Sequence, residues 1–347
     1  MRKLLDITKI GNMTLKNRFI SSAIGDFTGE GRINEKIIEK YETLAEGGVG
    51  TIITGVTLVD EAEKSFPILF IYDDSFIEDF KKLTDKVHSH GANFISQLVY
   101  IGSYVMGDVG EREVLGPSAV ENLNTKVVPK EMNINEIKAV QEKFAEAALR
   151  AKKSGFDGIE IHAAHGFLLN QFITPYYNRR NDIYGGSIEN RARMLLETYS
   201  AVRKAVGSEY QIWVKVNSVE GFEGGLTLDD CLYVCKELTR LGADAIEVSG
   251  NFMALSSSKE IYFKKEAAAI AKENNIAVIV TGGNRNFKEM EELLNNTEIE
   301  YFGMARPFIS EPDLINKYEK ENITKTKCVS CNQCTNPSNG GRCILNK

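Results

Sequence analysis

The chain has 347 residues, of which 43% are hydrophobic and 26% charged, and its formal net charge is −6. This acidic balance disfavours a nucleic-acid-binding protein, because such proteins normally present a basic surface. The sequence has no run approaching the roughly 20 apolar residues of a membrane-spanning helix, and its N-terminus does not read as a signal peptide. We therefore expect a cytoplasmic protein with neither a membrane nor a nucleic-acid partner.

Short apolar runs bounded by turn residues alternate with amphipathic helical patterns along most of the chain. Eight runs read as buried strands: Phe19–Ser22, Thr51–Thr54, Asn93–Leu98, Gly158–His162, Ile212–Asn217, Ala245–Ser249, Ala277–Thr281 and Tyr301–Met304. Six longer segments read as helices: Asn34–Glu46, Ser75–His90, Ile134–Ser154, Ser187–Val206, Leu228–Leu241 and Lys264–Asn274. Eightfold alternation predicts an α/β fold, the (β/α)8 TIM barrel.

The barrel accounts for nearly the whole chain, so we expect a single domain with two additions. Residues 99–133 form a long, glycine-rich loop after the third strand, which we interpret as a lid or a substrate wall. From residue 321 onward the helical periodicity is lost and cysteines accumulate. We therefore divide the chain into a barrel, residues 1–320, and a cysteine-rich C-terminal tail, residues 321–347.

Polar and glycine residues lie at the predicted C-terminal ends of the strands, where TIM barrels carry their active sites. They form one ring of candidates: Ser22, Gly25, Gly55, Gln97, His162, His165, Lys215, Asn217, Ser249, Asn251, Gly282, Gly283, Asn284, Ala305 and Arg306. This placement predicts a catalytic barrel that acts on a small-molecule substrate.

Two small-residue loops after the seventh and eighth strands predict a phosphate site. Gly282, Gly283 and Asn284 precede one helix, and Ala305 and Arg306 precede the next. Backbone N–H groups at a helix start bind anions, and the arginine adds a positive charge. The alternative is that the glycines only permit tight turns, but two adjacent loops and an arginine favour phosphate.

His162 and His165 follow the fourth strand, and Lys215 lies on the fifth. A histidine pair can bind a metal, but no third ligand is evident on a neighbouring strand end. A purely structural role is a second alternative. We favour a third, in which two N–H donors hold an oxygen that gains negative charge. A buried lysine facing the same cavity indicates an anionic or electron-rich ligand.

Several segments strongly resemble the Old Yellow Enzyme family of flavin-dependent ene reductases. The stretch from Gly155 to Phe172 and the block from Asn178 to Arg193 carry most of the resemblance. Shorter matches are Leu15–Arg18, Gln97–Leu98, Gly116–Ser118 and Ala305–Phe308. The resemblance covers roughly residues 4–320, and the block from Asn178 to Arg193 is its most specific part.

The resemblance implies a noncovalent FMN and an NAD(P)H electron donor. Ser22, Ala23 and Gly55 would contact the flavin ring, Gln97 its pyrimidine edge, and Lys215 the N1 and O2 atoms. Gly283, Asn284, Ala305 and Arg306 would bind the phosphate. His162 and His165 would bind the carbonyl oxygen of an α,β-unsaturated substrate whose β-carbon accepts hydride.

Two positions depart from the family pattern. Phe167 stands where the family usually has a proton-donating tyrosine, so another hydroxyl (Tyr100, Tyr104 or Tyr262) or solvent must supply that proton. Otherwise the reaction does not need the proton, as in a dehydrogenase, a double-bond isomerase or a nitroreductase. Gly25 replaces a side chain that often touches the flavin, which puts the flavin potential in doubt.

Four cysteines cluster in the tail, at Cys328, Cys331, Cys334 and Cys343. They resemble the 4Fe–4S segment of the larger dienoyl-CoA and enoate reductase branch, although their spacing is tighter. Zinc and free or redox-active thiols are the alternatives. A cluster would allow electrons to enter from an external carrier such as ferredoxin. Apart from this, we expect a homo-oligomer.

The leading interpretation is an FMN-dependent oxidoreductase that reduces the C=C bond of an α,β-unsaturated carbonyl compound. A dehydrogenase or isomerase of the same fold is the close alternative. A tRNA-modifying flavin barrel is disfavoured by the acidic charge. A cysteine-based redox or metal sensor would need an inert barrel mouth, and it is the interpretation we favour least.

Overall fold

The computed structural model describes residues 1–26, 31–63, 68–105, 110, 112–250, 261–336 and 341–346. Eight parallel strands form a closed barrel, in which each strand pairs with the next and β10 pairs back onto β7. They are β3 (Phe19–Ser21), β4 (Thr51–Ile53), β7 (Asn93–Val99), β10 (Gly158–Ala163), β11 (Gln211–Asn217), β12 (Ala245–Ser249), β13 (Ala277–Thr281) and β14 (Tyr301–Met304). The predicted TIM barrel is confirmed, and each predicted strand lies within one or two residues of an observed one.

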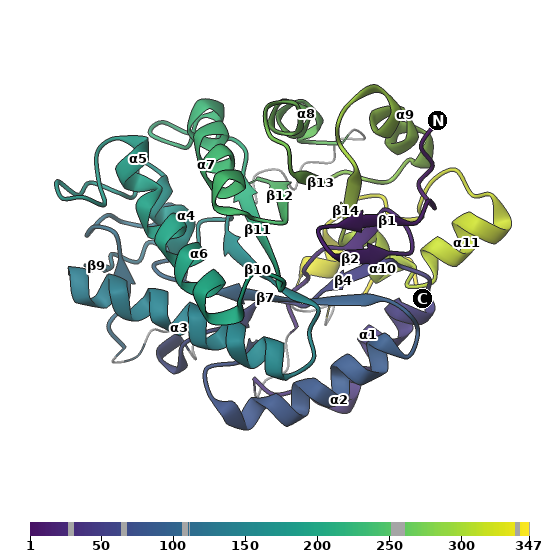
Figure 1. The fold of residues 1–347 in the computed structure, drawn as a ribbon, viewed down its shortest axis with the longest axis horizontal. Coiled ribbons are helices and arrows are strands. Elements are labelled where there is room, and N and C mark those ends of the chain that lie inside the picture. Colours follow the sequence, from purple (N-terminus) through teal and green to yellow (C-terminus); the bar gives the residue numbers. More distant parts are fainter. Residues whose placement is uncertain are drawn as a thin grey trace.

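Helices surround the barrel (Figure 1). They are α1 (Glu35–Glu46), α2 (Ile77–His88), α3 (Ile134–Lys153), α4 (Leu168–Ile173), α5 (Ile188–Arg191), α6 (Arg193–Val206), α7 (Leu228–Leu241), α8 (Lys264–Glu273), α9 (Phe287–Asn296), α10 (Arg306–Ser310) and α11 (Leu314–Glu321). The helix predicted from Ser187 to Val206 is interrupted at Ala192, which ends α5 and begins α6. Helix α4 was not predicted, because all six of its residues are buried and it has no polar face to mark a period.

Capping side chains explain where two long helices begin. The Asn133 side chain accepts from the Glu136 backbone N–H while the Glu136 side chain accepts from the Asn133 N–H, which starts α3. Thr227 and Asp230 form the same reciprocal arrangement at the start of α7. Each such cap satisfies backbone donors that the first helical turn would leave unpaired. No helix in the described ranges is both long and apolar enough to cross a membrane.

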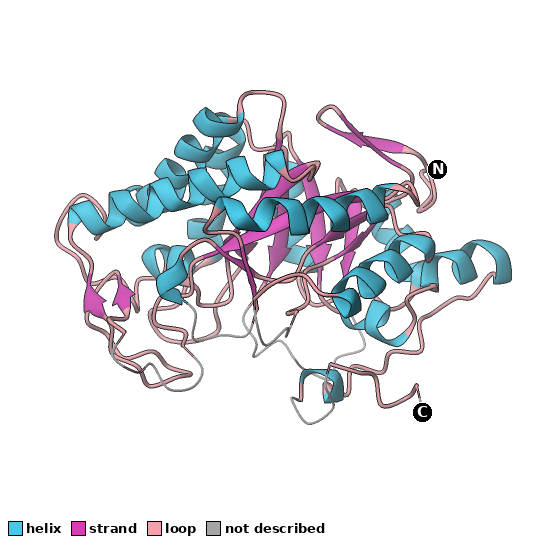
Figure 2. Cartoon of the chain, turned by 90° about the horizontal axis from the view of Figure 1, so that it is seen from below, coloured by secondary structure: helices cyan, strands magenta, loops and turns pink. Residues whose placement is uncertain are grey.

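An N-terminal hairpin closes the barrel at the end opposite the predicted mouth. It consists of β1 (Thr8–Ile10) and β2 (Met13–Leu15), and it contributes Ile10, Met13 and Leu15 to the barrel interior. There these side chains pack with residues from the strands: Ile20, Ile53, Ile95, Trp213, Ala245, Ile279 and Tyr301. In Figure 2 the hairpin lies above the barrel strands and the C-terminus lies below them.

The loop after β7 is held by the block of residues that is most specific for the family. Within the described part of this loop, β8 (Leu115–Gly116) pairs with β9 (Lys130–Glu131). The Arg180 guanidinium donates to the carbonyl oxygens of Pro117 at 2.9 Å and Met132 at 2.6 Å. Arg180 therefore ties the middle of the loop to its C-terminal end. Two further short strands, β5 (Thr57–Leu58) and β6 (Leu69–Phe70), extend the sheet beside β7.

The C-terminal tail packs against the barrel. Lys325 bridges to Asn286, and the Lys327 N–H donates to Glu311 Oε2 at 2.5 Å. Close to the C-terminus, the Asn346 side chain donates to the Ser310 carbonyl at 2.8 Å. The segment beyond residue 321 is thus tied to the same end of the barrel as α9 and α10, although it has little regular structure.

Candidate active site

A polar layer crosses the barrel interior directly above the apolar layer that the hairpin closes. Lys215, whose side chain is 3% exposed, donates to Glu247 Oε1 at 2.9 Å and to Ser22 Oγ at 3.0 Å. The hydroxyl groups of Ser22 and Thr281 donate to the same Glu247 oxygen at 2.5 and 2.6 Å. Burial alone would raise the pKa of Glu247, but the Lys215 charge and these donors lower it to about 2. Glu247 is therefore ionised, and it is the counter-charge that Lys215 requires.

Gln97 lies in the same layer and is oriented by a second buried carboxyl group. Its Nε2 donates to Glu160 Oε2 at 2.6 Å, which leaves the amide oxygen as an acceptor. Among the described residues, Gln97 Oε1 is buried without a hydrogen-bond partner. An oriented acceptor without a donor fits the N–H group on the pyrimidine edge of a flavin.

The two predicted histidines lie together at the mouth, with ring centroids 5.0 Å apart. The Ala164 N–H donates to His162 Nδ1 at 3.2 Å, so the hydrogen of the neutral ring is assigned to Nε2. His165 Nε2 lies 2.9 Å from Ser249 Oγ. Burial is the largest cause that lowers the pKa of both rings, to about 3 for His165, and the Lys215 charge adds to it. Both imidazoles are neutral at pH 7 and can donate a hydrogen bond.

His165 adopts a left-handed backbone conformation, with φ of 60°, and Gly166 follows with φ of 81°. This conformation is uncommon for a residue other than glycine, and it persists only where the surrounding structure enforces it. The Asn217 side chain accepts from the His165 N–H at 3.1 Å, and the Asn170 side chain accepts from the Gly166 N–H at 2.7 Å. These two buried amides fix the direction in which the His165 ring points.

Because both histidines are buried and neutral, we expect the stability of the folded protein to fall at acidic pH. A histidine with a lowered folded-state pKa adds stability above its unfolded pKa, about 6.5, and that stability is lost as the pH falls toward the folded pKa. We expect the free energy of unfolding to decrease by up to about 1.4 kcal/mol per pH unit per histidine below pH 6.5. Urea titrations of the wild type and of His162→Asn/His165→Asn measure the difference. Equal pH slopes for the two proteins would contradict the assignment.

The predicted phosphate residues line one cavity. Gly282, Gly283, Asn284, Ala305 and Arg306 surround it, together with Tyr262, Ser330 and His165. Consecutive positive φ angles of 119° and 81° at Gly282 and Gly283 require glycine, and such turns direct backbone N–H groups toward an anion. The Asn284 side chain has a different role, because its amide donates to the carbonyl oxygens of Val280 on β13 and Gly303 on β14 and so links the ends of these two strands.

Ala23 and Gly55, which were predicted to contact the flavin ring, differ in what the structure shows around them. Ala23 packs on the interior apolar cluster beneath the mouth. Gly55 has a packing explanation, since an added Cβ would lie 2.5 Å from the Ile24 carbonyl oxygen and 2.6 Å from Asp26 Oδ2. Its N–H already donates to the Tyr41 hydroxyl at 2.7 Å. Asn251, another predicted member of the ring, lies outside the described residues.

Phe167 lies directly on His162, with centroids 4.7 Å apart and rings nearly perpendicular. Tyr104 in turn packs edge-on against Phe167 at 5.5 Å. Of the other two candidate tyrosines, Tyr262 lines the phosphate cavity together with His165. Tyr100 is beside Glu63, Asp60 and Arg112, and the Tyr262 hydroxyl accepts from Arg306 at 3.4 Å.

Part of the cysteine-rich tail lies near the phosphate residues, with Cys334 beside Arg306. Arg306 donates to the Asn332 side chain, and Ser330 lines the cavity. Burial and the neighbouring Cys328 raise the pKa of Cys334, while Arg306 lowers it. A zinc ion bound through sulfur at about 2.3 Å needs sulfur atoms roughly 3.8 Å apart. Within the described ranges, no three tail sulfurs lie within 4.8 Å of one another, so the tail does not form such a tetrahedron.

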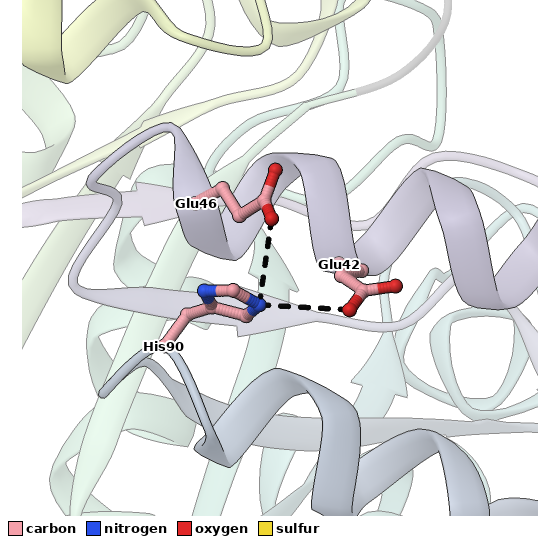
Figure 3. Close-up of side chains that lie close together, drawn as sticks. All are labelled: Glu42, Glu46 and His90. Atoms are coloured by element: carbon pink, nitrogen blue, oxygen red, sulfur yellow. Dashed lines mark ion pairs between the residues drawn. The ribbon is translucent and has the colours of Figure 1, made fainter.

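One other group in the described part of the chain brings three potential metal ligands together. His90 Nε2 lies 3.6 Å from Glu42 Oε1 and 3.7 Å from Glu46 Oε1 (Figure 3). Lys86 also pairs with Glu42 at 3.2 Å, so a lysine already offsets part of the negative charge of the two carboxylates. The group lies at the C-terminal ends of α1 and α2, hence at the end of the barrel opposite the mouth, and we interpret it as a surface ion-pair cluster.

Sequence reasoning missed Glu160, Glu247 and Thr281 as members of the site. They could have been found from the alternation of side chains along a strand, in which every second residue faces the barrel interior. Counting two residues from each apolar interior position reaches the polar layer, as from Trp213 to Lys215 and from Ala245 to Glu247. A single carboxylate inside an otherwise apolar strand is itself a signal, because it is costly unless it is paired.

An anion cradle on one side of the mouth and neutral imidazole donors beside it suit a phosphate-bearing cofactor and an electron-accepting substrate. The molecule therefore belongs to the phosphate-binding class of catalytic TIM barrels. The comparison with known families narrows this class. The chain belongs to the NADH:flavin oxidoreductase / NADH oxidase family, whose model matches residues 3–325.

Curated relatives agree with this assignment. The metal reductase of Desulforamulus reducens is 31% identical over 96% of this chain and 51% of its own length. The NADH oxidase of Thermoanaerobacter brockii is 32% identical over 93% of this chain and 52% of its own length. The NADPH dehydrogenase of Halalkalibacterium halodurans is 33% identical, over 89% and 92% respectively. The chain thus spans about half the length of the first two relatives.

Solved structures agree as well. A complex of 2-naphthoyl-CoA reductase superposes with a TM-score of 0.87 at 26% identity, over 95% of this chain and 54% of that one. The Old Yellow Enzyme homologue of Zymomonas mobilis superposes with a TM-score of 0.82 at 23% identity, over 94% and 95%, which shows the fold. The predicted family and its cofactors, FMN and a nicotinamide electron donor, are confirmed. The barrel is therefore the FMN-binding oxidoreductase domain that the family model describes.

Proposed function

We propose that the barrel reduces the C=C bond of α,β-unsaturated carbonyl compounds. The observation that carries this proposal is the pair of buried, neutral histidines at the mouth. Neutral N–H donors fixed in place bind a carbonyl oxygen and stabilise the negative charge that it gains when hydride reaches the β-carbon. When FMN is bound, it supplies the chemistry that accepts hydride from the nicotinamide donor and passes it to the substrate.

Each site residue has a defined task in this proposal. His162 donates from Nε2, and Ser249 holds His165 through its Nε2, which leaves the His165 Nδ1–H as the second donor. Lys215 presents a positive charge to the electron-rich edge of the flavin, and Gln97 presents its amide oxygen. Ser22, Ala23 and Gly55 line the ring side, and Gly283, Asn284, Ala305 and Arg306 bind the phosphate.

Flavin reoxidation tests the proposal directly. The FMN-loaded protein is photoreduced without oxygen, 2-cyclohexenone is added, and the flavin absorbance is followed. Rapid return of the oxidised spectrum is the expected result. If oxygen reoxidises the flavin but the enone does not, simple enone reduction is not the activity.

Phe167 favours a second candidate function, a flavin-dependent dehydrogenase or double-bond isomerase. A phenyl ring packed on His162 cannot donate the proton that completes saturation of the double bond. An isomerase moves a proton without net electron transfer, so its product would form without consumption of NAD(P)H. Incubation of the enzyme with a β,γ-unsaturated ketone, followed by chromatography of the products, distinguishes isomerisation from reduction.

We further propose that residues 1–320 form the FMN-binding barrel and residues 321–347 a tail that holds a 4Fe–4S cluster on Cys328, Cys331, Cys334 and Cys343. Contact between the tail and Arg306 supports an electron path from an external carrier to the flavin. We expect anaerobically purified protein to contain about four iron atoms per chain. The Cys334→Ser variant should contain fewer, and zinc or no metal in the wild type would contradict the cluster.

A further inference from the structure

Two fully buried carboxyl groups lie in the polar layer of the barrel interior, on the two strands that flank β11. They are Glu160 on β10 and Glu247 on β12, and Lys215 lies on β11 between them. Among the described residues, Glu160 Oε1 and Glu247 Oε2 have no donor partner. Since ionised carboxylates only accept hydrogen bonds, these two oxygens can satisfy each other only when one of the two carboxyl groups carries a proton.

The hydrogen-bond partners decide which carboxyl group carries the proton. Glu247 accepts from Lys215, Ser22 and Thr281, whereas Glu160 accepts from Gln97 alone within the described ranges. Charge-assisted donors stabilise an ionised carboxylate, so the negative charge belongs on Glu247. Burial and the neighbouring Glu247 charge raise the pKa of Glu160 well above its usual range. The other titratable groups that face this cluster are His162 and His165, and both are neutral.

We propose that Glu160 and Glu247 share one retained proton beneath the flavin, and that this proton keeps the Glu160–Glu247–Lys215 cluster electrically neutral. With both carboxylates ionised, one lysine would face two negative charges and would be drawn away from the cofactor. With one proton retained, Lys215 is balanced by Glu247 alone and remains held beside Ser22 at the mouth. Glu160 then acts as a positioning residue, because it also orients the Gln97 amide.

This inference rests on the proposed FMN contacts of Lys215 and Gln97, but the proton itself can be observed without the cofactor. A buried protonated carboxyl group gives a C=O infrared band that shifts in D2O. We expect the FMN-free wild type to show it at about pH 9, where Glu63, the buried carboxyl group whose pKa burial raises to about 7, is ionised and contributes no band. We expect Glu160→Gln to lose it and to keep FMN affinity within about threefold, because an amide replaces the O–H donor while still accepting from Gln97.

Glu247→Gln tests the charge balance. We expect Glu160 to ionise in its place, so that the band is lost and Lys215 keeps a counter-charge. In Glu160→Gln/Glu247→Gln, Lys215 has no counter-charge, and its field favours the reduced flavin, which carries more negative charge. We expect the ratio of the dissociation constants for oxidised and reduced FMN to rise at least about tenfold in the double variant. That rise is measured as an increase in the flavin midpoint potential.

The outcomes separate this inference from the proposed function. If the wild type lacks the band, or if Glu160→Gln retains it, the shared proton is refuted whatever the enzyme catalyses. If the band behaves as expected but the double variant leaves the midpoint potential unchanged, the cluster does not act on the flavin. If wild-type flavin is not reoxidised by an enone while the band and potential behave as expected, only the proposed reaction fails.

Discussion

The variant His162→Ala/His165→Ala is expected to slow reoxidation of the reduced flavin by 2-cyclohexenone by about 10²–10³-fold, the usual cost of removing oxyanion donors. In the proposed mechanism both neutral rings donate to the carbonyl oxygen as its negative charge develops, and alanine offers no donor in their place. The variant His162→Asn/His165→Asn is the control for geometry, because Asn tolerates the left-handed backbone that His165 adopts while its amide can still donate. Anaerobic stopped-flow absorbance of the flavin gives the rate.

Two control measurements show whether the rate loss is specific to the carbonyl-binding site. Reoxidation by molecular oxygen does not use a carbonyl oxygen, so its rate is expected to change by less than about threefold. The Asn217→Ala variant is the matched control for positioning, because it removes the side chain that accepts from the His165 N–H but keeps both rings. It should fall between the wild type and the alanine double variant. Enone reoxidation at the wild-type rate in the alanine double variant would remove the histidines from the proposed mechanism.

The barrel could be predicted because its strands differ sharply from their surroundings. Runs such as Ala277–Thr281 are buried along their length and end at a glycine pair, so both their type and their limits are encoded locally. Helix α4 shows the opposite case, since its six residues are all buried and nothing in their pattern separates a short helix from a loop. The same burial hid the interruption of the predicted helix at Ala192, which is itself fully buried.

The site could be predicted only in part, because sequence reasoning examined strand ends and ignored strand interiors. Lys215 was recognised as a costly buried charge, yet its counter-charge lies on the next strand at the directly paired position, Glu247. Pairing between strands far apart in sequence depends on register, which one chain does not reveal without its fold. The contact of Asn332 with Arg306 was hidden for a related reason, since an irregular tail has no period to place it.

The structure narrows the choice of proton donor for the reduction. The sequence left Tyr100, Tyr104, Tyr262 and solvent open. Phe167 fills the usual donor position and lies on His162, and the residue that packs on its far edge is Tyr104. Tyr104 follows β7, the strand that also carries Gln97, and it is nearly buried. The Tyr104 ring thus contacts Phe167, whose ring in turn contacts His162.

We therefore expect Tyr104→Phe to lower the rate of product formation from an enone by about 10²-fold or more, the typical loss when a positioned acid is removed. Flavin reduction by NAD(P)H should be unaffected, because that step needs no proton from this loop. Tyr100→Phe and Tyr262→Phe are matched controls that each remove one hydroxyl group and should stay within about threefold of the wild type. Phe167→Tyr in the Tyr104→Phe background restores a hydroxyl group beside His162 and should recover much of the rate. If all three single variants match the wild type, the proton comes from solvent, and the stereochemistry of deuterium incorporated from D2O at the α-carbon should then be mixed.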